Sequence, residues 1–371
     1  LSTEEISNIY ANQKERYHNL KVDVENKYTK SNCLIVEFNL ELQGFENKQM
    51  IICLGEDIDK IENIDRELEE VKGYWNKTLS EVQINTPDER LNIFMNNWCM
   101  YQTISSRIFS KTAYCQSGGA IGYRDQLQDT LCVKYADVNI MKDYILKAAA
   151  HQFIEGDVLH WWHEKNDLGV RTKFSDDLLW LVYILIEYIN YTNDFEILNM
   201  EVPYVQGDKL KDDENEKCKI YNVYGREETI FEHCIRAIEK GINLGNNNLP
   251  KIGSGDWNDG FSNIGDKGKG ESIWLGFFLY DILKRFEEIL KKLGKNELIE
   301  RYKIVRDVLK KSLNTFAWDG QWYIRAVTDT GEIIGSSKNE ECKIDSISQS
   351  WSVISEAGDN DKKFIAMDSV Y

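Results

Sequence analysis

The sequence predicts a mainly helical fold, in which paired helices form a ring and loops at one end of the ring build a site. Six segments carry apolar residues at the three- and four-residue spacing of a helix, as in LLWLVYILIEYI. Glycine-rich, charged and aromatic loops separate them, and all three prolines lie between them. No repeat of about 20–50 residues is visible, which argues against a solenoid. The six segments are 89–111, 126–152, 175–192, 226–244, 272–294 and 297–314.

Strand-like patterns occur in two other regions. Residues 14–56 include the alternating run CLIVEFNLEL and the short apolar run MIICLG, separated by polar turns. Residues 322–336, WYIRAVTDTGEIIGS, predict a hairpin around Asp-Thr-Gly. Between the first region and the helical series, DRELEEVKGYWNKTLSEV predicts a connecting helix.

The composition is that of a soluble globular chain and narrows the class of ligand. Of the 371 residues, 42% are hydrophobic and 29% charged, enough for a sizeable core and more than one domain. The net charge of −17 argues against nucleic acid and anionic membrane surfaces, since both are negatively charged. Neutral ligands such as sugars remain, and some of the 10 Trp and 19 Tyr can stack on their apolar faces.

The cysteine and histidine patterns predict a cytoplasmic protein without a metal site. The eight cysteines form no CxxC pair and no cluster with histidine at zinc spacing. His160 and His163 lie three residues apart, but no third ligand accompanies them. The N-terminal segment is polar and no run of roughly 18 apolar residues occurs, so neither a signal peptide nor a membrane span is predicted.

Four segments break the helical rhythm and are candidates for the site. Each mixes glycine or serine with Trp or Tyr and with Asp, Arg or Gln. Acids, bases and aromatic rings on loops that rigid helices hold in place suit a polyhydroxyl ligand. The segments are 114–130, 155–180, 252–261 and 346–359.

Taken singly, each candidate residue also has a purely structural interpretation. Ser175, Asp176 and Asp177 precede an apolar run, as an N-cap followed by acids in the first turn of a helix does. Four such segments in one chain nevertheless favour a binding site. The other structural interpretations are a surface pair of Arg124 with Asp125, core positions for Trp161 and Trp162, and turn positions for Asp256 and Asp259.

Six stretches, in order, resemble glycoside hydrolase family 94, which holds the inverting β-glycoside phosphorylases and a related domain of cyclic β-1,2-glucan synthases. The stretches cover most of the chain, from about Thr86 to Asp359, and their order makes the resemblance specific. They are QSGGAIGYRDQLQD, EGDVLHWW, GVRTKFSDDLLWL, GSGDWNDG, GKGESIWLG and QSW.

The resemblance implies three parts in this chain. Residues 86–371 are expected to form an (α/α)6 barrel, preceded by a helical linker at 58–85. Residues 1–57 are expected to be the C-terminal part of a β-sandwich domain. In the family, a His-containing segment and a Thr-Gly segment near the end of the barrel help to bind phosphate.

Neither phosphate-binding segment is present in this chain, so we expect the barrel to be incomplete at its C-terminus and the chain to be a piece of a longer enzyme. An open ring leaves apolar helix faces uncovered. We therefore expect exposed apolar surface and an oligomer, for which a homodimer is the candidate.

The resemblance also implies a reaction and its residues. The expected enzyme is a glycosyltransferase of the glycoside phosphorylase type, which uses phosphate to cleave a β-linked glucoside with inversion and gives α-glucose 1-phosphate. It uses no cofactor beyond inorganic phosphate as co-substrate. Asp259 matches the family's general acid, and Arg171 and Asp177 match residues that hold the donor sugar. The further candidates for substrate binding are Trp257, Arg124, Asp125, Gln128, Gln349 and Trp351.

A general acid must keep its proton near neutral pH, and the position of Trp257 suggests how. Burial of a carboxyl beside an apolar ring disfavours its charged form and raises its pKa. Trp257 lies two residues before Asp259 and can provide that ring. Asp256, on the other side of Trp257, is the competing carboxyl, and the family match favours Asp259.

Two other classes of function stay open. One is a hydrolase or glucanotransferase on the same barrel, including the domain of a cyclic glucan synthase. The other is an inactive carbohydrate-binding fragment. Release of sugar 1-phosphate only in the presence of phosphate distinguishes the phosphorylase from both.

Overall fold

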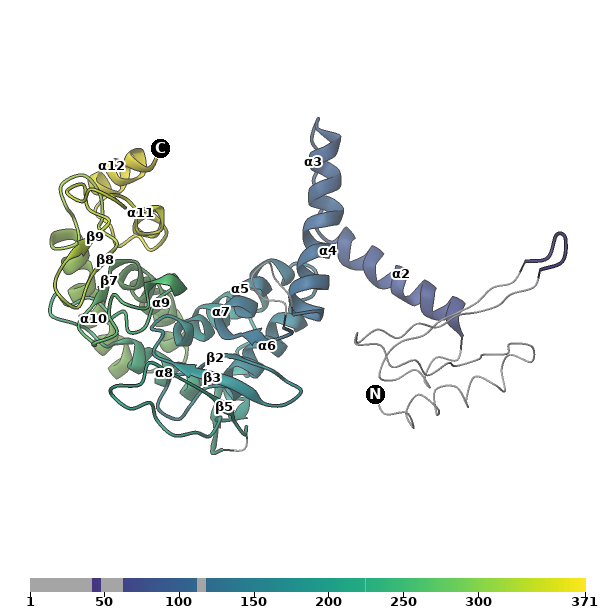
Figure 1. The fold of residues 1–371 in the computed structure, drawn as a ribbon, viewed down its shortest axis with the longest axis horizontal. Coiled ribbons are helices and arrows are strands. Elements are labelled where there is room, and N and C mark those ends of the chain that lie inside the picture. Colours follow the sequence, from purple (N-terminus) through teal and green to yellow (C-terminus); the bar gives the residue numbers. More distant parts are fainter. Residues whose placement is uncertain (1–41, 48–62, 112–117, 224) are drawn as a thin grey trace, which may run out of the picture. The chain divides into compact units, whose positions relative to one another are not determined.

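The computed structural model describes residues 42–47, 63–111, 118–223 and 225–371. The chain divides into two compact units, Leu1–Leu68 and Glu69–Tyr371. The predicted sandwich strands of residues 1–57 lie outside the described residues, except for 42–47, which contain a turn. The described parts are mainly helical with small sheets, as the sequence predicts (Figure 1).

Helices follow the turn at 42–47 in the described part of the chain. Helix α2 spans Ile64–Ser80 and begins one residue before the stretch Asp65–Val82, for which the sequence predicts a connecting helix. A second, nearly continuous helical segment follows the loop after α2. It contains α3 (Glu89–Ile93), the π-helical turn η2 (Phe94–Cys99), α4 (Met100–Gln102) and the π-helical turn η3 (Thr103–Phe109).

Four helix pairs form the body of the larger unit among its described residues, and Figure 1 shows their arrangement. Within each pair the two helices pack together: α5 with α6, α7 with α8, α9 with α10, and α11 with α12. The odd-numbered helices also pack in a row, in the order α5, α7, α9, α11. Their bounds are α5 Tyr123–Val133, α6 Val138–Ala150, α7 Asp177–Thr192, α8 Ile230–Gly241, α9 Ile273–Lys292, α10 Asn296–Thr315, α11 Ser346–Ile354 and α12 Asn360–Val370.

The sequence explains why the helices begin where they do and which faces they bury. Asp137, Thr229, Ser272 and Asp345 are N-caps of α6, α8, α9 and α11, and each side chain accepts a hydrogen bond from a backbone N–H of the first turn. Helix α7 is apolar on nearly all sides and is buried on nearly all sides, as expected for a helix in the middle of a row.

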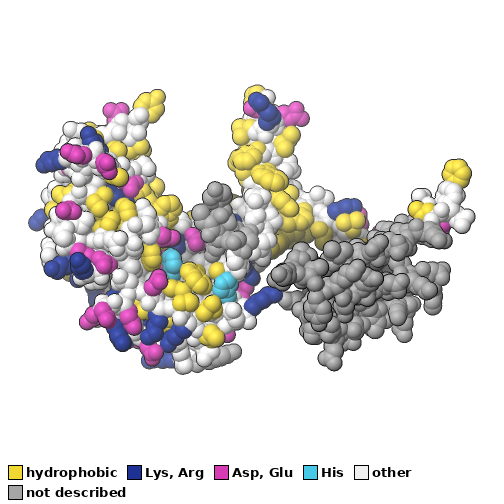
Figure 2. Space-filling model, in the orientation of Figure 1, with side chains coloured by type: hydrophobic (Ala, Val, Ile, Leu, Met, Phe, Trp, Pro, Cys, Tyr) yellow, Lys and Arg dark blue, Asp and Glu magenta, His cyan; other side chains and the backbone are white. Residues whose placement is uncertain are grey.

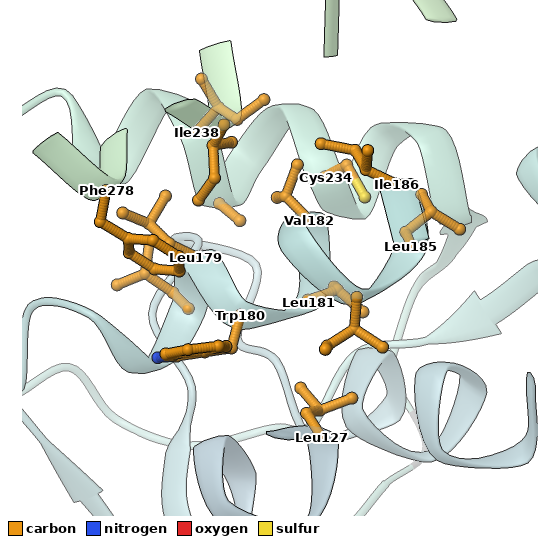
Figure 3. Packing of buried hydrophobic residues seen from close by; sticks show 14 of the residues in the cluster. Leu127, Leu179, Trp180, Leu181, Val182, Leu185, Ile186, Cys234, Ile238 and Phe278 are labelled. Atoms are coloured by element: carbon orange, nitrogen blue, oxygen red, sulfur yellow. The ribbon is translucent and has the colours of Figure 1, made fainter. Parts of the chain in front are cut away.

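The core lies where α5, α7, α8 and α9 meet (Figure 3). Leu181 and Val182 of α7 are completely buried there. At the α9 side, Phe278 is surrounded by aromatic rings, with ring centroids 4.7 Å from Trp180 and 5.1 Å from Trp351. These rings join α7, α9 and α11, so these three helices share one continuous aromatic core.

Three small antiparallel sheets connect the helices. The largest has the order β1-β2-β3-β5, and two smaller ones pair β4 with β6 and β7 with β8 and β9. The predicted hairpin at 322–336 is confirmed as β8–β9. The bounds are β1 Ile121–Gly122, β2 Leu159–Trp162, β3 Leu168–Thr172, β4 Glu201–Pro203, β5 Glu216–Ile220, β6 Glu227–Thr229, β7 Glu271–Ser272, β8 Ala326–Val327 and β9 Ile333–Ile334; 3-10 turns occupy Glu196–Asn199 and Asp259–Phe261.

Three expectations for local structure were wrong. The segment 126–152 is two helices, since Asp137 caps a new helix after α5 ends. The segment 155–180 contains the strands β2 and β3, because β3 pairs with the distant β5. The segment 346–359 contains α11, because Trp351 packs into the aromatic core. In the segments 155–180 and 346–359, contacts with distant residues decide the secondary structure, and local composition does not.

Exposed apolar side chains occur, among other places, on two helical segments. Figure 2 shows hydrophobic side chains along the helical segment that begins with α3, where the exposed residues include Phe94 and Trp98. On α12, Phe364 is 79% exposed, and Ile365 and Met367 are also exposed. Such surface is the expectation for helix faces that lack a partner. Among the described residues, no helix combines the length and the hydropathy that crossing a membrane would need.

We predict that Phe278→Ala lowers the free energy of unfolding by about 3–5 kcal/mol, the usual cost of removing a buried aromatic ring. Phe278 is completely buried among rings from three helices. The control Phe364→Ala should change stability by less than about 0.5 kcal/mol, since its ring is mostly exposed. Urea denaturation of both variants checks this, and equal losses would contradict the assigned core.

Candidate active site

The N-terminal ends of the odd-numbered helices carry charged or polar side chains that contact one another. Arg124 is the second residue of α5, Asp176 is the N-cap of α7, Ser272 is the N-cap of α9, and Asp345 is the N-cap of α11. Hydrogen bonds and ion pairs link these ends into one cluster, which we call the helix-end network. Its members are Arg124, His160, Asp176, Asp177, Asp256, Asp259, Ser272, Arg325 and Asp345.

Arg124 is the central cation of the network. Its Nη2 donates a hydrogen bond to Oδ1 of Asp259 at 2.7 Å. Its Nη1 donates to the backbone carbonyl of Asp256 at 3.1 Å and to Oδ2 of Asp176 at 3.3 Å. The guanidinium is almost completely buried, so these partners satisfy a charge that water cannot reach. Arg124 therefore joins α5, the start of α7 and the loop 252–261.

Asp256 has a structural role in the site. Its two carboxylate oxygens each accept a hydrogen bond of 2.6 Å from the Arg325 guanidinium. The hydroxyl of Ser272 donates a further 2.6 Å bond to the same carboxylate. The second guanidinium edge of Arg325 contacts Asp345 at 3.0 Å. Because Asp256 is completely buried in these contacts, its carboxyl is not available to a ligand.

Two glycines bring the loop 252–261 against the strand end before α7. Gly253 has a φ of +63°, and an added Cβ would lie 2.0 Å from the carbonyl oxygen of Lys173. A Cβ on Gly255 would lie 2.4 Å from the Phe174 ring. Only glycine fits such close approaches. The loop is then fixed by the hydrogen bond from the Ser175 N–H to the Gly255 carbonyl, at 3.0 Å.

Trp257 and Asp259 project from this fixed loop. The Trp257 side chain is 46% exposed, and its indole N–H donates to Oε1 of Gln128 at 3.3 Å. The Asp259 side chain is 58% exposed and ion-paired with Arg124. The apolar surroundings that the sequence predicts for Asp259 are therefore not present. The loop offers a partly open indole and a partly open carboxylate on either side of Asn258.

The aspartates at the start of α7 do more than cap the helix. Asp176 is the N-cap, but its carboxylate bonds the Trp180 indole N–H at 3.0 Å and Arg124. Burial raises the pKa of Asp176 above its ordinary value. Asp177 accepts a hydrogen bond from His160, and its Oδ1 has no hydrogen-bond partner among the described residues. A simple capping interpretation therefore does not account for either carboxylate.

His160 is a member of the network that the sequence did not single out as a site residue. Its Nδ1 lies 2.7 Å from Oδ2 of Asp177, and its ring is stacked on Phe174 with 4.4 Å between centroids. Burial lowers the pKa of His160, but the Asp177 carboxylate outweighs burial and raises the pKa to about 9. The only signal in the sequence was its place in the segment HWWH.

The remaining candidates have other partners in this structure. The Arg171 guanidinium is held by both oxygens of Asp157, by Glu155 and by the carbonyl groups of Gly207 and Asp208. Asp125 is half-buried in the first turn of α5. Their roles in sugar binding stay predictions.

The two candidates on α11 lie inside the protein. Gln349 is completely buried and bonds both the N–H and the carbonyl of Tyr323. Trp351 is half-buried and packs on Phe278 and Trp274. Both hold α11 against its neighbours, and their roles near a sugar also stay predictions.

A mainly helical domain gathers an exposed indole, an exposed carboxylate and a buried network of acids and arginines at one set of helix ends. This combination is typical of carbohydrate-active enzymes. Residues 74–371 match the model of the Glycosyl hydrolase 94 superfamily, catalytic domain, so the chain belongs to this family.

Curated relatives agree with this assignment. The chain is 39% identical over 304 residues to the cyclic β-(1,2)-glucan synthase NdvB of Rhizobium meliloti (strain 1021), which covers 82% of this chain and 11% of that protein. It is 26% identical to the N,N'-diacetylchitobiose phosphorylase of Vibrio proteolyticus, with 85% and 41% covered. It is 29% identical to the solabiose phosphorylase of Paenibacillus borealis, with 74% and 32% covered. The chain thus spans less than half the length of these relatives.

A solved structure is similar in fold alone. It is a GH78 family rhamnosidase of Bacillus sp. GL1, with a TM-score of 0.50 at 11% identity, and the match covers 76% of this chain and 26% of that one. The likeness agrees with a mainly helical fold.

We predict that the two aspartates beside Trp257 differ in their effect on stability. Asp256→Asn should lower the free energy of unfolding by about 3–5 kcal/mol, because it breaks a buried ion pair with Arg325. Asp259→Asn should change it by about 1 kcal/mol or less, since the Asp259 carboxylate is mostly exposed. Chemical denaturation of the two variants is the measurement. A larger loss of stability for Asp259→Asn than for Asp256→Asn would refute the structural role assigned to Asp256.

Proposed function

We propose that the protein cleaves a β-linked glucoside by phosphorolysis with inversion and releases α-glucose 1-phosphate. The observation that carries the proposal is the exposed Asp259 carboxylate close to the exposed Trp257 indole on one fixed loop. Membership of the family, and the similarity to relatives named as phosphorylases, support the class of reaction.

In the proposed reaction Asp259 is the general acid. Its carboxyl donates a proton to the glycosidic oxygen as the bond from that oxygen to the anomeric carbon breaks. Inorganic phosphate, already an anionic nucleophile, attacks the anomeric carbon from the opposite face. A β-linkage therefore gives an α-phosphate, and the acceptor sugar leaves with the proton. In the reverse direction Asp259 takes the proton from the acceptor hydroxyl.

The state of the other carboxylates supports phosphorolysis over hydrolysis. An inverting hydrolase needs a second free carboxylate, which activates water as a general base. Asp176 and Asp256 are buried and paired with arginines, and Asp345 caps α11 while it binds Arg325. Among the described members of the helix-end network, Asp259 has the most exposed carboxylate. A phosphorylase requires one carboxyl that the substrate can reach, and the partly exposed Asp259 meets this requirement.

Trp257 and the start of α7 are the proposed donor site. The Trp257 indole, oriented by Gln128, offers an apolar face for a sugar ring. Arg124 and Asp177 line the network behind it, and Asp125, Arg171, Gln349 and Trp351 complete the proposed set. Phosphate is the co-substrate, and we propose no metal or other cofactor.

A second candidate function is supported by the 39% identity to the cyclic β-(1,2)-glucan synthase. On this alternative, the same barrel and Asp259 act on a β-1,2-linked glucan as a hydrolase or transferase. An inactive carbohydrate-binding domain is the third alternative. A requirement for phosphate distinguishes the phosphorylase from the hydrolase or transferase. Turnover of any glucan distinguishes both enzymes from the inactive carbohydrate-binding domain.

The architecture and setting that we propose follow the family. The row of four helix pairs supports an (α/α)6 barrel at 86–371, after a linker at 58–85 and the end of a β-sandwich at 1–57. We propose a homodimer and a cytoplasmic location, with β-glucosides and phosphate as the partners.

We predict that Asp259→Asn lowers kcat for phosphorolysis by about 10²–10⁴-fold and leaves the Kd for the sugar nearly unchanged. General acid assistance acts only as the glycosidic bond breaks, so its loss falls on the rate and not on binding. Initial rates of sugar 1-phosphate release, with cellobiose, laminaribiose and sophorose as trial substrates, measure the first quantity. Calorimetry of sugar binding measures the second.

The comparison variant is Asp256→Asn, assayed at a temperature at which it is shown to be folded. It should retain more activity than Asp259→Asn in both directions, because its carboxyl contacts Arg325 inside the protein. An inactive Asp256→Asn beside a fully active Asp259→Asn would place the acid on the other side of Trp257.

A further inference from the structure

A β-bulge sets the position of His160. Strands β2 and β3 pair as Leu159 with Arg171 and then as Trp161 with Val170, so one extra residue, His160, lies on β2 between these pairs. A bulge turns the side chain of the extra residue away from the regular alternation of the strand, and bulges occur often beside active sites. The bulge thus determines the direction of the His160 side chain.

The bulge places His160 in front of a buried carboxylate. Nδ1 of His160 is 2.7 Å from Oδ2 of Asp177, and the ring is nearly parallel to Phe174, at 6°. The Asp177 side chain is 1% exposed and the His160 side chain 19% exposed. Nε2 of His160 has no hydrogen-bond partner in the part of the chain that the structure describes. Asp177 therefore holds the imidazole at Nδ1, while the side chain stays partly exposed to a ligand.

The surrounding charges determine which form of the imidazole is present. Burial and Arg124 from α5 oppose the cation, but Asp177 from α7 and Asp259 from the loop 252–261 favour it, with a resulting pKa of about 9. Near neutral pH His160 thus carries both protons. Nδ1–H donates to Asp177, and Nε2–H is a charged donor that no described residue accepts from. A buried carboxylate behind a histidine commonly fixes the ring in this way.

We propose that His160 contacts the donor sugar directly, with Nε2–H donating a hydrogen bond to a sugar oxygen, and that Asp177 acts through His160. This inference rests on the proposed function of the site. This contact differs from direct binding of the sugar by Asp177, because Oδ2 of that buried carboxylate is already bonded to the imidazole, and only Oδ1 lacks a hydrogen-bond partner among the described residues. His160 is then the charged hydrogen-bond donor of the donor site, and Asp177 is its positioning residue.

A neutral sugar suits this donor better than phosphate does. Asp177 and Asp259 both place negative charge close to His160, and Arg124 is already shared with Asp176 and Asp259. An approaching phosphate would be repelled by these carboxylates, whereas a sugar hydroxyl is not. Phosphate alone is therefore the control ligand.

The direct test is nuclear magnetic resonance of the ¹⁵N-labelled histidine side chains in the intact protein. The chain has five histidines, and the resonance missing in His160→Asn identifies His160. Saturating cellobiose, laminaribiose or sophorose should shift the His160 Nε2 resonance, and inorganic phosphate alone should not. If a sugar binds and this resonance does not move, the inference is wrong while the proposed function stands. If none of these sugars binds, both are wrong.

Two variants separate contact with the sugar from a structural role. His160→Asn keeps an amide N–H near the position of Nδ1 and so keeps the bond to Asp177, but nothing replaces Nε2. His160→Gln places an amide N–H near Nε2. We expect His160→Asn to weaken sugar binding by about 10–100-fold, the usual effect of losing a charged hydrogen bond. His160→Gln should weaken it less. If the His160→Asn protein binds the sugar as tightly as the wild type, His160 only supports Asp177.

The pH dependence adds a readout that a structural role would not give. Above a pH of about 9, His160 loses one proton, keeps Nδ1–H toward Asp177, and presents Nε2 without hydrogen. Sugar affinity of the wild type should then fall as pH rises through about 9, and that of His160→Asn should stay flat there. The same fall in both proteins would overturn the assignment of the donor to His160.

Discussion

The site depends on one buried guanidinium, that of Arg124. It is reached by a carboxylate from the start of α7, by the backbone of the loop 252–261 and by the carboxylate of Asp259. Burial of such a charge is unfavourable unless ion pairs and hydrogen bonds compensate it. Arg124 therefore links α5, the start of α7 and the loop 252–261, and these links fix the position of Asp259.

The fold brings these partners together because the odd-numbered helices start at the same place. Each of α5, α7, α9 and α11 contributes a polar residue from its first turn or its N-cap. The positive ends of the helix dipoles favour carboxylates at these starts, which agrees with the many aspartates there. The second arginine, Arg325 of the β8 hairpin, neutralises Asp256 and links α9 with α11. Charge and helix packing thus stabilise the same arrangement.

The sequence predicted the helical class, most helix bounds and the loop 252–261, because apolar spacing and glycine clusters are local signals. It did not reveal the strands β2 and β3 or helix α11, which depend on pairing with distant residues. It pointed to Asp259 and Asp177, but not to His160, which depends on a bulge in β2. It also expected Asp259 beside apolar surface, where the structure has the ion pair with Arg124. Ion pairs between residues far apart in sequence leave no local pattern.

The most direct test of the central claim is the identity of the first product formed by the protein from a β-linked diglucoside. Proton and phosphorus magnetic resonance, recorded during turnover, distinguish α-glucose 1-phosphate from free glucose and give its anomeric form. We expect α-glucose 1-phosphate as the first product, formed only when inorganic phosphate is present. Free glucose released at the same rate with and without phosphate, or a β-phosphate, would contradict it.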